Sequence, residues 1–303
     1  FIYGEDLWVA AKNGANPRRI TIDEGVESNP VFSPDGNMIA FNAQYDGNTD
    51  VFVVPVTGGV PKRLTWHPGA DLVRDFSPDG KRAIIQVRSF DNKDRWIANV
   101  DLANAKLQPR HHLHDEAWIN TGSSGNQTYN RFGWLPDGHH LWFMSEQTGY
   151  SHLYLDNGNA IRALTSGRWE ATRAQWSADG NVVYFQCNRQ SPGDYEICAI
   201  GRDGGGIREI TALDGVEDFT LSPDGAKLLV RNSSAYMPPQ AYVVDAAGGQ
   251  AKQLTDTRTA EFKAREWIQP QIVQVPSKHG AGTIWGKYYG PATMEPGRKY
   301  PIV

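Results

Sequence analysis

The sequence predicts an all-β fold, a β-propeller of four-stranded blades, and three observations support this. A tight-turn motif recurs five times, at intervals of 44, 58, 42 and 45 residues. A period of 40–45 residues without helices is typical of propeller blades. Helical periodicity is absent except for a modest candidate at 259–267. The five copies are "FSPDG" at 32–36 and 76–80, "WLPDG" at 134–138, "WSADG" at 176–180 and "LSPDG" at 221–225.

Each turn predicts a junction between the first and second strands of a unit. In the first copy, Pro34 presets the backbone for a β-turn, Asp35 tolerates the next position, and Gly36 can adopt positive φ. The second strands are almost continuously apolar, which predicts cover on both faces: "NMIAF", "KRAIIQV", "HHLWFMS", "NVVYFQC" and "AKLLVRN". The third strands are "DVFVVPV", "RWIANVDL", "HLYLDNG", "YEICAIG" and "AYVVDAA". A fourth strand then closes the unit with "KRLT", "RALT", "REIT" or "KQLT".

The ends of the chain predict the domain organisation. Residues 1–21 correspond to the end of a second strand and to strands three and four, so we expect residues 1–258 to form a propeller that starts inside a blade. We expect about six blades in the longer protein, with a range of about five to eight. Residues 259–303 lack the turn motif, so we expect a separate structural element there, a linker followed by short strands. These strands cover "WIQPQIVQVP", "TIWGKYYGP" and the start of a third at "KYPIV".

Composition excludes several classes of function. The net charge is −4 with mixed signs, which argues against a nucleic-acid partner. No apolar run approaches the 18 or so residues of a membrane helix, so we expect no membrane span. The chain starts at Phe1 and shows no signal peptide, so the sequence does not decide the compartment. The protein is either periplasmic or secreted, or it is cytoplasmic, and we favour the periplasm.

The two cysteines lie in neighbouring predicted strands. If the hairpin turns near Ser191 and Pro192, Cys187 and Cys198 face each other across the ladder. Two buried thiols are the favoured interpretation. The alternative is a cross-strand disulfide, which would imply an oxidising compartment.

No catalytic residue, metal ligand or cofactor site is predicted in this chain. A nucleophile elbow needs G-x-S-x-G, whereas "TGSSGN" (121–126) has the wrong spacing and "GYSHL" (149–153) lacks the second glycine. The histidines His111, His112 and His114 sit beside Asp115 and Glu116, and we expect a solvated loop there, since consecutive residues rarely converge on one ion.

Other candidate residues also have a structural explanation. His139 and His140 are expected to flank a strand. Asp46 and Asn48 are expected to lie in a hairpin loop, because the glutamate that completes a calcium-binding loop is absent. The sequons "NQT" (126–128) and "NSS" (232–234) matter only in a glycosylating pathway. Core packing is the favoured role for the aromatic residues that could otherwise stack on sugars or bases, namely Trp66, Trp118, Trp134, Trp142, Trp169 and Trp176.

Residues 266–303 resemble the entry to the α/β-hydrolase domain of the prolyl oligopeptidase family, in which a strand like "KYPIV" leads into the catalytic domain. This likeness implies that residues 259–303 form a linker and the first strands of a truncated α/β-hydrolase domain. The first two repeats also resemble TolB-type and tricorn-type propellers. The dipeptidyl peptidase IV-like branch is suggested by four stretches in matching order, "DEAWIN" (115–120), "MSEQTGYSHLYL" (144–155), "LTSGRWEATRAQW" (164–176) and "NSSAYMPPQAYVVD" (232–245).

This resemblance implies a serine exopeptidase that releases short N-terminal peptides, with a Ser–His–Asp triad outside this chain. The propeller would cover the active site and admit short or unfolded peptides, so a peptide substrate and the chain's own hydrolase domain are the expected partners, and a homo-oligomer stays open. Members of this branch hold the substrate amine with a pair of glutamates; here Asp115–Glu116 is the nearest acidic pair. The substrate-binding residues are therefore unknown. The alternative is a TolB-type or tricorn-type propeller that binds a protein or peptide without a hydrolase of its own.

The roughly 14 extra residues in the second interval lie within 104–131 and predict a long loop on the rigid scaffold.

Overall fold

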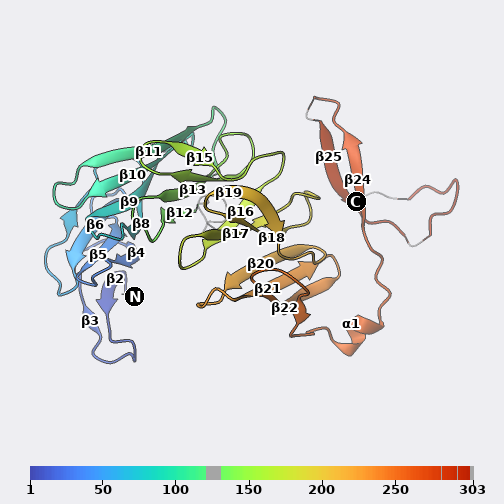
Figure 1. The fold of residues 1–303 in the computed structure, drawn as a ribbon, viewed down its shortest axis with the longest axis horizontal. Helices are drawn as coiled ribbons and strands as arrows, with labels where there is room; N and C mark the ends of the chain where they lie inside the picture. Colours follow the sequence, from blue (N-terminus) through green and yellow to red (C-terminus); the bar gives the residue numbers. More distant parts are fainter. Residues whose placement is uncertain (121–130, 281, 292, 301–303) are drawn as a thin grey trace. The chain divides into compact units, whose positions relative to one another are not determined.

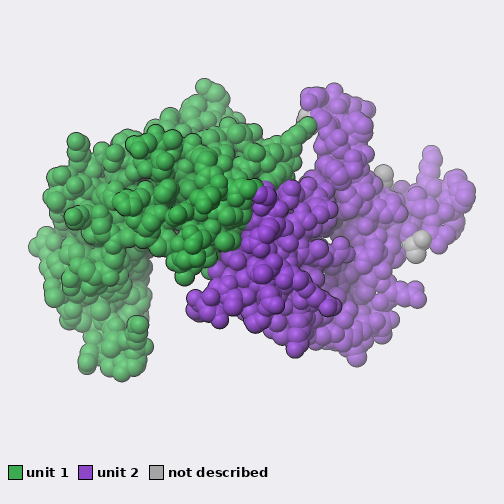
Figure 2. All heavy atoms as spheres, in the orientation of Figure 1, with its two compact units in different colours: residues 1–183, 200–205 green, residues 184–199, 206–303 purple. Residues whose placement is uncertain are grey.

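The computed structural model describes residues 1–120, 131–280, 282–291 and 293–300. These residues form short strands connected by tight turns (Figure 1). The chain divides into two compact units, residues 1–183 with 200–205 and residues 184–199 with 206–303 (Figure 2). Each unit is described by itself below.

The described residues contain five four-stranded sheets, which confirms the predicted propeller blades. In each sheet the strands lie side by side in chain order, or in its reverse. Their bounds follow. The first sheet is β4 (Glu27–Phe32), β5 (Met38–Ala43), β6 (Asp50–Pro55) and β7 (Lys62–Arg63). The second is β8 (Asp71–Phe76), β9 (Arg82–Arg88), β10 (Asp94–Asp101) and β11 (Leu107–His114). The third is β12 (Phe132–Trp134), β13 (Leu141–Ser145), β14 (His152–Asp156) and β15 (Ile161–Ala163). The fourth is β16 (Ala171–Trp176), β17 (Val182–Cys187), β18 (Glu196–Gly201) and β19 (Gly204–Glu209). The fifth is β20 (Val216–Leu221), β21 (Lys227–Ser234), β22 (Met237–Asp245) and β23 (Lys252–Gln253).

The N-terminal residues form a three-stranded sheet, β1 (Ile2–Tyr3), β2 (Asp6–Val9) and β3 (Arg18–Arg19). That the chain starts inside a blade stays a prediction.

The repeated turn has the geometry expected from its residues. Gly36 has φ of 72°, and its N–H donates to the carbonyl of Ser33 at 2.8 Å. The Ser33 hydroxyl donates to Asp35 at 2.6 Å and accepts the N–H of Met38 at 2.9 Å, which fixes the start of the second strand. The motif is therefore a self-contained device that reverses the chain, since it satisfies its own polar groups.

The core lies on both faces of the second and third strands. In β9, Ile84 and Ile85 point to opposite faces and both are fully buried. Ile85 packs in a cluster with Val51 and Val73, whereas Ile84 packs with Phe143 and Tyr154 of the third sheet. Cover on both sides is therefore confirmed for β5, β9, β13 and β17. It is wrong for β21, in which buried and exposed residues alternate and Leu229 is 54% exposed.

The two cysteines form a disulfide, with their Cα atoms 6.0 Å apart. The favoured interpretation of two thiols is therefore wrong and the alternative holds. Cys187 is the last residue of β17, and Cys198 lies in β18, the neighbouring strand of the same sheet. The two side chains therefore meet across the hairpin.

The C-terminal segment begins with α1 (Ala260–Ala264), capped by the Thr259 hydroxyl, as the helical candidate predicts. It continues into β24 (Gln271–Pro276) and β25 (Thr283–Tyr288), an antiparallel pair. Of the expected third strand, Lys299 and Tyr300 are not in a strand and the rest lies outside the described residues. The hydrolase domain thus stays a prediction. No helix in the described residues has the length and apolar character needed to cross a membrane.

Candidate functional site

The two ends of each four-stranded sheet carry different connections. At the turn end, the tight turn joins the first two strands. At the loop end, a loop joins the second and third strands, and the chain leaves the fourth strand, because antiparallel neighbours alternate in direction. The chain also leaves β23 at the loop end, toward α1, β24 and β25. Loop-end residues are consequently the first to examine for function.

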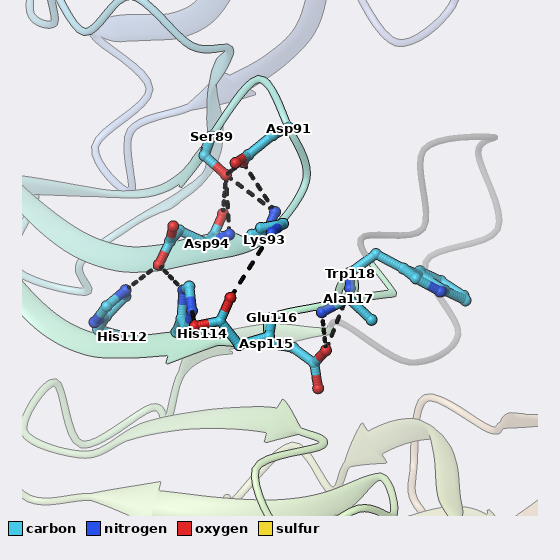
Figure 3. A network of polar contacts seen from close by, with 10 residues as sticks. All are labelled: Ser89, Asp91, Lys93, Asp94, His112, His114, Asp115, Glu116, Ala117 and Trp118. Atoms are coloured by element: carbon cyan, nitrogen blue, oxygen red, sulfur yellow. Dashed lines mark hydrogen bonds and ion pairs between the residues drawn. The ribbon is translucent and has the colours of Figure 1, made fainter.

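A network of polar side chains lies at the loop end of β10 and β11 (Figure 3). The register places Asp94 opposite His114 and Trp96 opposite His112. Because paired residues share a face and side chains alternate, both histidines lie on the same face as Asp94. One oxygen of Asp94, Oδ1, lies 2.7 Å from His112 Nε2 and 2.8 Å from His114 Nδ1.

The electrostatics of this network follow from its geometry. Hydrogen bonds to His112 and His114 hold the pKa of Asp94 below its usual range. The same carboxylate raises the pKa of His114 above 6.5, and Glu116 adds to this effect. The ring of His112 also stacks on Trp96, with centroids 4.8 Å apart. A carboxylate thus positions two exposed imidazoles, and it favours the protonated form of one of them, His114.

The adjoining loop at 115–120 is organised by its own carboxylate. Asp115 Oδ1 accepts the N–H groups of Ala117 at 2.8 Å and Trp118 at 3.2 Å (Figure 3). Glu116 instead extends toward Lys93, with 3.8 Å between Nζ and Oε2. Asp115 and Glu116, the nearest acidic pair, therefore have different partners in the structure, and their role as amine ligands stays a prediction.

The histidine segment forms a strand rather than the expected solvated loop. His111 is buried on the opposite face of β11, stacks on Phe143 with centroids 4.4 Å apart, and lies 3.2 Å from the Ser145 hydroxyl. Burial lowers the pKa of His111 to about 4, so it is neutral at physiological pH. The alternation of His112, Leu113 and His114 is a period-two signal that could have identified this strand.

The tryptophans divide into two groups. Trp134, Trp142, Trp169 and Trp176 are half-buried between strands, in accord with a packing role. Trp66 and Trp118 are 60% and 63% exposed, so the core-packing prediction is wrong for these two. Both follow the fourth strand of their sheet and lie at the loop end.

The remaining candidate residues have structural roles. Ser151 of "GYSHL" is buried and donates to the Ala171 carbonyl at 2.8 Å. Asn48 donates to the carbonyl of Gly69 at 3.0 Å within the predicted hairpin loop. His139 and His140 follow the turn directly before β13, and His140 lies 2.8 Å from Asp137. "TGSSGN" and the sequon "NQT" lie outside the described residues.

The sequon asparagine at 232 is buried, and its amide donates to the Asp214 carbonyl at 3.0 Å. Within the part of the chain that the structure describes, no three His, Cys, Asp or Glu side chains are placed to hold a metal ion.

A repeated Thr–acid connection was missed at the sequence level. The Thr211 hydroxyl accepts the N–H of Ile197 at 2.9 Å and donates to Glu217, whose other oxygen accepts the N–H of Leu213 at 2.9 Å. These hydrogen bonds connect the segment after β19, at the end of the fourth sheet, to β20, the first strand of the fifth sheet. The first copy has the same six-residue spacing, with Thr21 bonded to Glu27 at 2.5 Å. A threonine shortly after a fourth strand, followed six residues later by an acid, was the available signal; it recurs at Thr65 and Asp71 but not at Thr165, which is followed by Ala171.

A pocket of about 430 Å³ lies at the loop end of the last sheet, beside α1. Its aromatic wall stacks Trp267 on Tyr236, with centroids 5.1 Å apart, and on Phe262 at 4.6 Å. Arg258 and Lys263 supply its cationic side, and both pair with Asp256. The pocket can hold a group with both apolar and polar surface.

The five four-stranded sheets and the segment after β23 place this chain in a class of proteins, the β-propeller domains that continue into a further segment after the last blade. Residues 73–239 match the family model of the dipeptidyl peptidase IV (DPP IV) N-terminal region, and residues 1–133 match that of the tricorn protease N-terminal β-propeller domain. The chain belongs to the dipeptidyl peptidase IV N-terminal region family.

Solved structures agree with this fold. Dipeptidyl peptidase 4 of Porphyromonas gingivalis matches 99% of this chain and 50% of its own, with 16% identity and a TM-score of 0.79. A putative dipeptidyl aminopeptidase IV of Bacteroides ovatus matches 99% of this chain and 53% of its own, with 15% identity and a TM-score of 0.74. TolB of Acinetobacter baumannii matches 82% of this chain and 61% of its own, with 19% identity and a TM-score of 0.50. The chain thus spans about half the length of the two peptidase structures.

Proposed function

We propose that this chain is the gating and substrate-selecting propeller of a serine peptidase that releases short N-terminal peptides. In this proposal residues 1–258 form the propeller, and residues 259–303 form the linker and the first strands of the hydrolase domain. The chain itself holds no nucleophile, and the catalytic triad lies in the hydrolase domain. The observation that carries the proposal is the membership of residues 73–239 in the dipeptidyl peptidase IV N-terminal family.

The C-terminal hairpin supports the hydrolase part of the proposal. Ile272, Val275 and Ile284 are about half exposed on β24 and β25. A two-stranded hairpin is marginally stable by itself, and exposed apolar residues of this density mark a surface that packs against something. Such a hairpin fits the first strands of a larger domain.

The position of the exit supports the gating part. The hairpin follows the loop end of β23, so the chain enters a domain built on it from the loop end of the last sheet. The Asp94–His114 network and the exposed Trp118 also lie at a loop end, in unit 1. Aromatic and titratable groups at such an end can select peptides by contact and by charge.

A second candidate is a binding module without a hydrolase. It is favoured by the match of residues 1–133 to the tricorn propeller model and by the TolB structural match. In this case the loop ends would dock a protein or peptide partner.

The experiment expresses the complete reading frame that contains this chain. The proposal expects labelling by a fluorophosphonate serine probe and cleavage of peptides from their N-terminus, whereas the 303-residue chain alone stays unlabelled. A complete protein that binds peptides but is not labelled would favour the second candidate and contradict the first.

Gating is tested in the same protein with Trp118→Ala at a loop end and Ile161→Ala at the turn end of β15, both at exposed side chains. We expect Trp118→Ala to change the KM ratio between a short and a long peptide without changing the labelling rate, and Ile161→Ala to change neither. Equal effects of the two variants would contradict a gate at the loop end.

A further inference from the structure

A second pocket, of about 410 Å³, lies in unit 1 on the face of β9, β10 and β11 that includes Asn99. Arg82 and Asp101 are paired in the register, and Asn99 lies two residues before Asp101 on the same face. Arg82 follows the turn at 76–80, so the pocket is at the turn end of the sheet, away from the loop ends on which the proposed function depends.

The floor of this pocket is a buried amide without a partner. Asn99 is 1% exposed, and among the described residues neither its Nδ2 nor its Oδ1 has a hydrogen-bond partner. Burying such a group is unfavourable unless it is hydrogen-bonded, so the amide is prepared to donate to and accept from a molecule in the pocket.

The fold does not require an asparagine at this position. Counting back two residues from the end of the third strand in the other four sheets gives apolar or aromatic residues. These are Val53, Tyr154, Ala199 and Val243. Asn99 is thus a departure from the repeat, and such departures are expected at binding sites.

The walls carry opposite charges that are not paired with each other. Within the described residues Arg82 and Asp101 form no ion pair; Arg82 lies 3.5 Å from Asp79 and over the ring of Trp134 at 4.8 Å, and Asp101 Oδ1 accepts the N–H groups of Ala103 and Asn104. The equivalent pair at the turn end of the last sheet, Lys227 and Asp245, is in direct contact at 2.6 Å. The second sheet therefore presents a cation and an anion that do not contact each other, next to a buried amide.

We propose that this pocket binds a small zwitterion, a free amino acid or dipeptide, with its carboxylate toward Arg82 and its ammonium toward Asp101. Asn99 hydrogen-bonds the backbone between the two charged groups. Lys106, which lines the same pocket, adds to the attraction for the carboxylate. The volume lies within the range of small-molecule sites. A zwitterion fits best because its two charged groups can contact the cation and the anion of the pocket at the same time.

The test uses the 303-residue chain and alanyl-alanine as the probe, followed by isothermal titration and by the amide signals in NMR spectra. The expected result is saturable binding that shifts the side-chain amide signal of Asn99. The N-acetylated and the C-terminally amidated dipeptides should bind about tenfold more weakly or worse, since each lacks one charge. Equal binding of all three forms, or no saturable binding up to about 10 mM, would overturn the proposal.

Variants locate the site. Asn99→Leu replaces the amide with an apolar side chain of similar size and should abolish binding. Arg82→Met and Asp101→Asn are at the surface and should each weaken binding about tenfold, and Lys227→Met, its counterpart in the last sheet, should leave it unchanged. Binding that survives both Asn99→Leu and Arg82→Met would place the dipeptide elsewhere and refute the assignment. The test needs no peptidase activity, so its outcome is independent of the proposed function.

Discussion

Glu217 links the Thr–acid connection to the pH dependence of stability. Its side chain is fully buried, and burial raises its pKa to about 7 from an ordinary value of 4.5. Between these values the folded chain keeps a proton that the unfolded chain has released, so the free energy of unfolding falls as pH rises from 4.5 to 7. The difference corresponds to about 3 kcal/mol, at about 1.4 kcal/mol for each pH unit.

Glu217→Gln removes this titration while keeping the shape of the side chain. We expect the wild type to lose about 2 to 3 kcal/mol of stability relative to the variant between pH 5 and pH 8, measured by urea unfolding. Glu209→Gln removes one carboxylate from the surface of the same unit and controls for the change in net charge. A difference between wild type and Glu217→Gln that does not vary with pH would refute the reasoning.

Three further predictions concern single interactions. Asp71 is fully buried, its Oδ1 lies 3.8 Å from His67 Nδ1, and burial raises its pKa to about 7. Asp71→Asn should therefore raise the free energy of unfolding by about 1 to 3 kcal/mol more at pH 8 than at pH 5; an effect that does not depend on pH would be inconsistent with a buried carboxyl whose pKa is raised. Asp94→Asn should lower the pKa of His114 in an NMR titration, and an unchanged value would exclude the hydrogen bond. Replacing Cys187 and Cys198 by alanine should lower the urea midpoint by an amount equivalent to about 3 kcal/mol, whereas an unchanged midpoint would show that the disulfide does not stabilise the chain.

The blade pattern could be predicted because it depends on short-range chemistry. A turn such as Ser33–Gly36 satisfies its own hydrogen bonds, and the apolar strand after it needs only cover on both faces. The same local logic predicted α1 and the hairpin β24–β25. The cysteines could be placed opposite each other, but their oxidation depends on chemistry outside the local sequence.

The polar network could be predicted less well. Asp94 meets His114 through the register of β10 and β11, which is set by long-range pairing rather than by neighbouring residues. The Thr211–Glu217 bond is different, since it joins residues six apart and the same spacing at Thr21 and Glu27 could have indicated it. The exposure of Trp66 and Trp118 depends on which end of a sheet they occupy, and composition carries no information about that.

The central claim is that this propeller belongs to a serine peptidase whose catalytic domain begins in the C-terminal segment. The most direct measurement is fluorophosphonate labelling of the protein from the complete reading frame, followed by mass spectrometry of the labelled peptide. The account predicts one labelled serine that lies after Val303, within a G-x-S-x-G sequence. Labelling of a serine within residues 1–303, or no labelling of the complete protein, would contradict it.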